Sequence, residues 1–73
     1  MSHQVNAELV ASVLKVVVKR GDRVAPEDTL VILESMKMEI PVQAEVTGTV
    51  SDIGVNEGDV VTEGDLIAHI EED

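Results

Sequence analysis

The sequence repeats itself at a spacing of 37 residues, and this repeat restricts the fold to two similar halves. Residues 5–33 align with residues 42–70 without a gap, and nine of the 29 aligned positions are identical. Composition alone would give roughly two or three identities over that length. The constant spacing also preserves the alternation that decides which side chains of a strand face the core. We therefore predict a pseudo-twofold fold in which 5–33 and 42–70 superpose.

Apolar runs rich in valine and isoleucine, separated by turn residues about every ten positions, predict an all-β chain. No helical period stands out, and the 73 residues suffice for one domain, expected to span 1–73. Such a small core leaves no room for a deep ligand cavity. The pattern favours a sandwich or barrel with main strands near 5–10, 13–18, 30–34, 38–43, 47–53 and 66–71 and shorter ones near 23–25 and 60–62.

One reversal between two apolar runs lacks the residues that tight turns prefer. The segment Glu34-Ser35-Met36-Lys37-Met38-Glu39 contains no Gly, Asn or Asp, whereas the other reversals carry one or more of these residues. Departures from local turn chemistry are expected at functional sites. An ordinary surface lysine on a long strand is the alternative. The repeat places the counterparts of Lys37 just beyond the chain ends, so we predict that Lys37 lies at the opposite pole from both termini.

The charge and composition exclude several classes of function. Five basic and fifteen acidic residues give a net charge of −10, which disfavours nucleic acid and anionic membranes as partners. The chain has no cysteine, so thiol chemistry and disulfides are excluded. Its first residues open into no apolar run, which predicts no signal peptide, no membrane span and a cytoplasmic location.

The sequence also lacks the residue patterns of a catalytic or metal site. His3 and His69 are the only histidines, far apart in the sequence and without ligand-like spacing, so no metal site is expected. Ser35 has neither a neighbouring base nor a nucleophile-elbow context. We therefore expect a protein that is not an enzyme.

The segment around Lys37 resembles the Glu-Ala-Met-Lys-Met motif of biotin carboxyl carrier domains, the biotinyl branch of the biotinyl/lipoyl attachment family. The second half, with its Gly58-Asp59 and Gly64-Asp65 turns, is also similar to the closing half of that family, and the resemblance covers essentially the whole chain. In length the chain looks most like the free-standing biotin/lipoyl attachment proteins. Two positions depart from the family pattern: Ser35 replaces the usual alanine, and Ala11 stands where glycine is frequent.

The resemblance implies a flattened barrel (a barrel-sandwich hybrid) of two four-stranded sheets, with the modified lysine on an exposed hairpin. Lys37 would then carry biotin as an amide, with Met36, Met38, Glu34 and Ser35 forming the surrounding motif. Met36 and Met38 would either contact partner enzymes or pack the hairpin onto the barrel.

The implied partners are a biotin protein ligase, which attaches biotin, and the biotin carboxylase and carboxyltransferase between which the carrier moves a carboxyl group. The free chain is expected to be a monomer. A lipoyl carrier is an alternative, less favoured because lipoyl sites typically read Asp-Lys-Ala. A third reading is a structural barrel that carries no modification.

Overall fold

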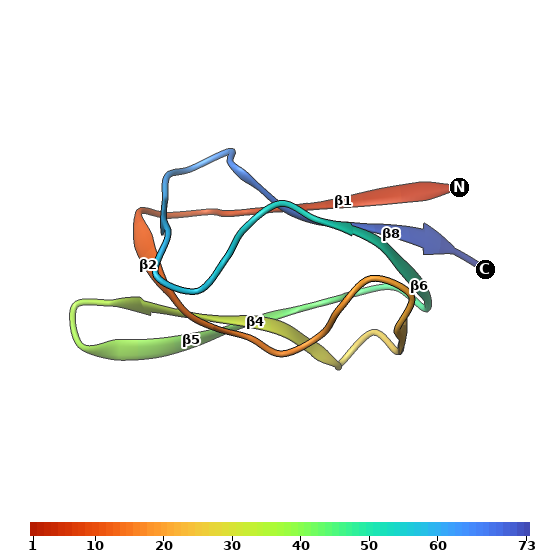
Figure 1. The fold of residues 1–73 in the computed structure, drawn as a ribbon, viewed down its shortest axis with the longest axis horizontal. Helices are drawn as coiled ribbons and strands as arrows, with labels where there is room; N and C mark the ends of the chain where they lie inside the picture. Colours follow the sequence, from red (N-terminus) through yellow and green to blue (C-terminus); the bar gives the residue numbers. More distant parts are fainter.

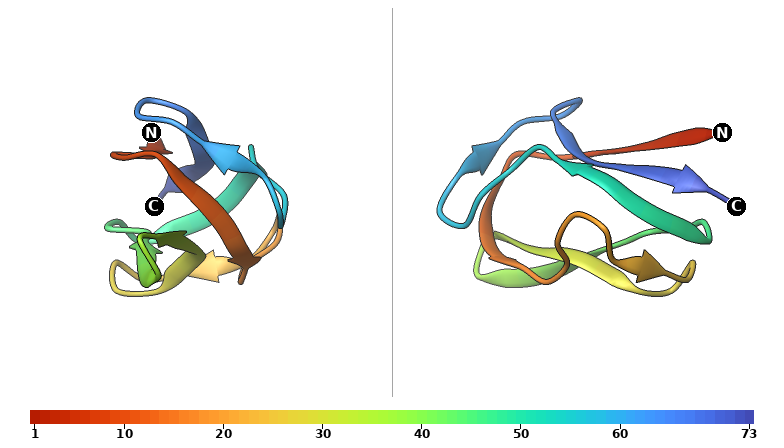
Figure 2. Two further views of the ribbon diagram at one scale, coloured as in Figure 1. Left: turned by 90° about the vertical axis from the view of Figure 1, so that its left-hand side faces the viewer. Right: turned by 45° about the vertical axis from the view of Figure 1, so that its right-hand side comes forward.

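The computed structural model describes all 73 residues as eight strands in two four-stranded antiparallel sheets (Figure 1). One sheet has the order β1-β8-β6-β3 and the other has the order β5-β4-β2-β7. Views from other directions show the two sheets wrapped around a common interior, as the flattened-barrel prediction requires (Figure 2). The strands are β1 Ser2–Asn6, β2 Ala11–Val16, β3 Arg23–Val24, β4 Thr29–Ser35, β5 Met38–Gln43, β6 Gly48–Ile53, β7 Val60–Val61 and β8 Leu66–Glu72.

The 37-residue repeat is visible in the strand bounds and in the topology. Adding 37 to the bounds of β2, β3 and β4 gives the bounds of β6, β7 and β8, and β1 corresponds to β5 within one residue. The same exchange converts the order of one sheet into the order of the other. The predicted two-half architecture is therefore confirmed.

Two of the predicted strand positions in the first half are wrong. The first strand was expected at 5–10 but covers Ser2–Asn6, and the second was expected at 13–18 but covers Ala11–Val16. The error came from treating apolar residues as strand residues. Val10 and Val17 lie outside strands and are exposed, at 62% and 48%.

The turns of the two halves share one hydrogen-bonding scheme. The carboxylate of Asp22 accepts a bond from the amide of Lys19 at 3.0 Å, and Asp59 does the same for Asn56 at 2.9 Å. A second pair of aspartates, Asp28 and Asp65, repeats this scheme with the amides of residues 25 and 62. The duplicated aspartates are therefore turn-forming residues, as expected for side chains that bond to nearby backbone amides.

The core is formed by 15 buried aliphatic side chains from both sheets. No buried side-chain polar atom lacks a hydrogen-bond partner, so the interior needs no ligand to satisfy it. β4 and β8 have the same pattern of buried positions, which is the packing consequence of the repeat. The most completely buried large side chains are Leu30, Leu33, Ile67 and Ile70.

The molecule is elongated, with principal extents of 35 × 18 × 17 Å. The two termini meet at one end of the long axis, where the amide of Glu72 donates to the carbonyl of Met1 at 2.7 Å. The hairpin between β4 and β5 forms the opposite end (Figure 1). The predicted separation of Lys37 from both termini is therefore confirmed.

Candidate functional site

Lys37 lies in the two-residue loop that joins β4 to β5. Ser35 and Met38 are the last paired residues of the hairpin, so only Met36 and Lys37 form the turn. Both have positive φ, 54° and 64°. Positive φ at both central residues is the pattern of a type I′ turn, which matches the twist of the adjoining strands. The structure therefore confirms a tight reversal at the position where the sequence lacks turn residues.

The turn presents its side chains to solvent. Lys37 is exposed, and no ion pair or side-chain hydrogen bond engages its ammonium group. Met36 is 91% exposed and Met38 is 65% exposed. Met36 therefore has no packing role on the barrel, whereas Met38 is covered in part. They remain available for contact with another protein, a use that suits flexible and polarizable side chains.

The other two motif residues, Glu34 and Ser35, are the last two residues of β4 before the turn. Ser35 is half-buried, while Glu34 is exposed and lies directly opposite Glu39 in the β4–β5 register. Like charges placed directly opposite each other destabilise a sheet. No basic side chain pairs with either carboxylate, because the two ion pairs of the structure join Arg20 to Asp52 and Arg23 to Asp73. The base of the hairpin is therefore a site of unrelieved negative charge.

Replacing Met36 by asparagine is expected to stabilise the protein by about 0.5–1 kcal/mol, because asparagine tolerates the left-handed conformation that costs methionine about 1 kcal/mol. Thermal unfolding would measure this as a rise in Tm of roughly 4 °C. Met38→Asn is the matched control. Met38 lies in β5, where asparagine is disfavoured, so this variant should show no gain. A Tm for Met36→Asn at or below that of the parent would contradict the assignment of strain to the turn.

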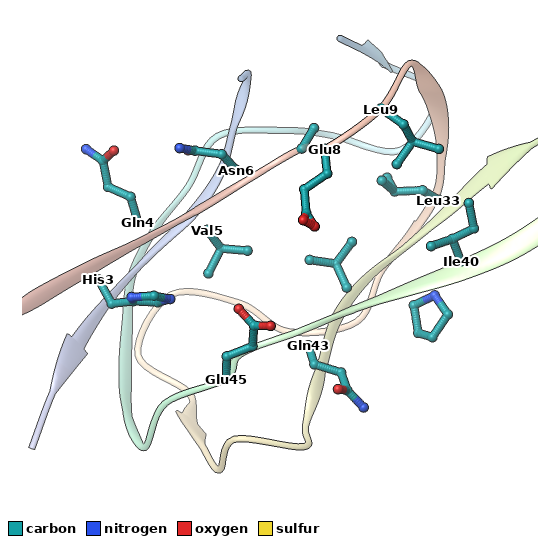
Figure 3. Close-up of a pocket in the computed structure, with 13 residues that line it drawn as sticks. His3, Gln4, Val5, Asn6, Glu8, Leu9, Leu33, Ile40, Gln43 and Glu45 are labelled. Atoms are coloured by element: carbon teal, nitrogen blue, oxygen red, sulfur yellow. The ribbon is translucent and has the colours of Figure 1, made fainter. Parts of the chain in front are cut away.

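A groove of about 370 Å³ lies between the edge strands β1 and β5, away from the hairpin tip (Figure 3). Figure 3 shows the carboxylates of Glu8 and Glu45 directed into it from opposite sides. None of the motif residues 34–38 lines this groove. It therefore takes no part in presenting Lys37.

The fold brings the two histidines onto neighbouring strands, although they are far apart in the sequence. His3 lies opposite Ile70, and His69 lies opposite Gln4. Neighbouring register positions point to opposite faces of a sheet, so the two imidazoles do not converge. No cluster of three or more potential metal ligands exists in the structure.

The only perturbed ionisable groups belong to the end that carries the termini. Arg23 donates two hydrogen bonds to the carboxylate of Asp73, at 2.8 and 2.6 Å. This contact lowers the pKa of Asp73 and raises the pKa of Arg23.

No helix in the structure is long and apolar enough to cross a bilayer.

A small barrel that displays one exposed, unpaired lysine on a two-residue turn has the arrangement of an attachment domain, a class of protein that offers a side chain for covalent modification. A family model described as "Biotin-requiring enzyme", which covers biotin and lipoyl attachment, matches residues 4–70. The chain belongs to this family.

Relatives of similar length carry names that refer to biotin. A protein named "Biotinylated protein TB7.3 homolog" from Mycobacterium leprae is 60% identical over 70 residues, which cover 96% of this chain and 99% of that protein. The "Biotin/lipoyl attachment protein" of Bacillus subtilis is 41% identical over 66 residues, covering 90% of each chain. The resemblance to free-standing attachment proteins is therefore confirmed.

The fold also occurs within a much larger enzyme. The crystal structure of Kluyveromyces lactis urea carboxylase contains a segment that matches 97% of this chain with a TM-score of 0.90 and 35% identity. That segment is 6% of the urea carboxylase chain. The relatives thus support a carrier of biotin more than a carrier of lipoyl groups, and none of those of similar length is named as a catalytic subunit.

Proposed function

We propose that Lys37 is the residue to which biotin is attached and that the chain is a biotin carrier serving a carboxylase system. The observation that carries this proposal is the placement of Lys37. It is the one lysine on the hairpin turn, exposed and unpaired, at the end of the molecule farthest from the termini. The lysines in the first half, Lys15 and Lys19, lie in β2 and in the loop that follows it.

The attachment step is an acyl transfer. The amine of Lys37 attacks the carbonyl carbon of biotinyl-adenylate held by a biotin protein ligase. An amide bond forms, the bond between the carbonyl carbon and the phosphate oxygen breaks, and AMP leaves. A lysine amine must lose a proton before it can act as a nucleophile, and no side chain of this chain forms an ion pair with Lys37. The ligase therefore supplies the base, while the carrier supplies position.

Lys37 would hold biotin through an amide bond, and the attached group would supply the chemistry of carboxyl transfer between two active sites. The chain contributes a projecting tip and two exposed methionines, which can contact differently shaped partners. We expect these partners to be a biotin carboxylase and a carboxyltransferase. We expect the free carrier to be monomeric.

The test asks which of two groups, biotinyl or lipoyl, becomes attached to the protein. Purified protein is incubated with ATP and either biotin and a biotin protein ligase, or lipoate and a lipoate ligase, and the intact mass is measured. We expect the mass to increase by one biotinyl group per chain and by no lipoyl group. A lipoyl adduct alone would establish the lipoyl alternative, and the absence of both would favour the unmodified structural barrel.

A further inference from the structure

The two sheets end in open edges where β1 and β5 face each other across the groove of Figure 3. In the sheet orders, β1 pairs only with β8, and β5 pairs only with β4. Most residues that line the groove from one strand are the repeat counterparts of those that line it from the other. The pseudo-twofold axis therefore passes through this groove.

Of the four edge strands, β1 alone lacks the features that prevent another strand from pairing. Edges present unpaired backbone groups, and proteins protect them by keeping them short or by placing proline or charged residues on them. β3 and β7 have two residues each, and β5 contains Glu39 and Pro41. β1 has five residues, none of which is proline, lysine, arginine, aspartate or glutamate.

The pairing of β1 with β8 determines which backbone groups of β1 are free. The carbonyl of Met1 accepts a bond at 2.7 Å at one end of the strand, and the amide of Ala7 donates one at 2.8 Å just beyond the other end. Bonded and non-bonded residues alternate along an antiparallel strand, so the even-numbered residues between these ends point their amide and carbonyl groups away from β8. These residues are Ser2, Gln4 and Asn6.

β5 lacks one of the amides that a strand on its edge would need. Pro41 is the repeat counterpart of Gln4, so its nitrogen occupies the position whose N–H would point into the groove. Proline has no N–H, and within sheets it is confined to positions where no ladder bond is lost. The fold therefore accepts proline at this position, and an added strand would pair with β1 and not with β5.

The groove beside β1 is acidic. Glu8 and Glu45 reach into it from opposite sides, and neither takes part in the two ion pairs of the structure. Its other lining residues include Val5 and Val42 but no lysine or arginine. A lysine or arginine from a partner has an aliphatic stem that suits the valines and a charged head that suits the carboxylates. The net charge of −10 opposes the alternative occupant, a second copy of this chain.

We propose that β1 accepts an extended segment of another protein as an additional strand, and that this segment places a lysine or arginine between Glu8 and Glu45. Pairing along β1 would engage about five residues of the segment, roughly 17 Å of extended chain. Main-chain bonds would supply affinity, and the carboxylates would supply specificity. Residues 34–38 do not line the groove, so a chain held there keeps Lys37 free. The inference does not depend on what is attached to Lys37.

The experiment titrates the isotope-labelled protein with a synthetic peptide and follows backbone amide resonances by NMR. The peptide is Thr-Val-Thr-Lys-Thr-Val-Thr with blocked ends, in which the alternation of a strand places the lysine between two valines on one face. A control peptide has glutamate in place of lysine. Gln4→Pro introduces the counterpart residue and removes an outward amide, and Pro41→Gln is the matched control on β5. Glu45→Gln tests the charge.

We expect the lysine peptide to shift the amide resonances of β1, with a Kd of about 0.1–1 mM. Gln4→Pro should weaken binding at least tenfold while Tm stays within about 2 °C of the parent, because the fold accepts proline at the counterpart position. Glu45→Gln should weaken binding about threefold, as expected for an exposed ion pair. Pro41→Gln and Lys37→Arg should bind as the parent does, and the glutamate peptide should bind at least tenfold more weakly.

Three results would overturn the proposal. The first is the absence of shifts in β1, or parent-like binding by Gln4→Pro, either of which would exclude strand addition. The second is equal affinity for the two peptides, which would exclude a basic occupant. The third is a shift of the same amides with protein concentration in the absence of peptide, together with a doubled mass in sedimentation, which would assign the edge to a second copy of this chain.

Discussion

A Lys37→Arg variant is expected to lose biotinylation completely, a fall of at least a hundredfold against the detection limit of intact-mass measurement. Arginine keeps the positive charge and the length of the side chain, but its guanidinium stays protonated and cannot act as the nucleophile. The turn backbone should be unaffected, because residue 37 is exposed and makes no side-chain bond. We therefore expect the free energy of unfolding to remain within about 0.5 kcal/mol of the parent.

Lys15→Arg and Lys19→Arg are the matched controls for this prediction. Both lysines are exposed, as Lys37 is, so accessibility alone would allow all three to react. Peptide mass mapping of the labelled parent should place biotin on Lys37 alone, and both control variants should be labelled as fast as the parent. Label on Lys15 or Lys19, or retained labelling of the Lys37 variant, would show that the hairpin is not the attachment site.

The 37-residue repeat gives the strand positions of the first half more accurately than the apolar runs do. Strands expected at 38–43 and 47–53 lie at Met38–Gln43 and Gly48–Ile53 in the structure. Subtracting 37 from these ranges gives 1–6 and 10–16, close to the observed β1 and β2. The ranges expected from apolar runs alone, 5–10 and 13–18, were displaced. Exposed valines such as Val10 and Val17 made these runs look longer than the strands they contain.

The sequence predicted where the site lies, but it did not predict the conformation of the turn or which residues lie beside it. The missing turn residues and the repeat together identified Lys37 as an exposed tip. The two positive φ values required the structure, because neither methionine nor lysine favours that conformation. The opposition of Glu34 and Glu39 across the hairpin also required the strand register that the structure supplies.

The repeat also isolates a position where the two halves differ sterically. Gly48 begins β6, is buried, and pairs with β3 on one side and β8 on the other. A methyl group added there would overlap the carbonyl oxygen of Glu71 and lie 2.8 Å from its carbonyl carbon and 3.0 Å from the Cα of Glu72. These are backbone atoms of β8, so they cannot move aside as a flexible side chain could. The counterpart of Gly48 is Ala11, which is buried at 6% exposure between β4 and β7.

We therefore expect Gly48→Ala to destabilise the protein by about 3 kcal/mol, since relieving the overlap requires β6 and β8 to separate. In a domain of this size the loss corresponds to a fall in Tm of roughly 12–24 °C, measurable by thermal unfolding. Ala11→Gly is the matched control and should cost about 1 kcal/mol, through backbone entropy and one lost methyl contact. Equal losses of stability in the two variants would mean that the backbone of β8 moves aside at no greater cost than that of β4. The glycine would then reflect backbone preference, and the close approach of β6 to β8 would not be its cause.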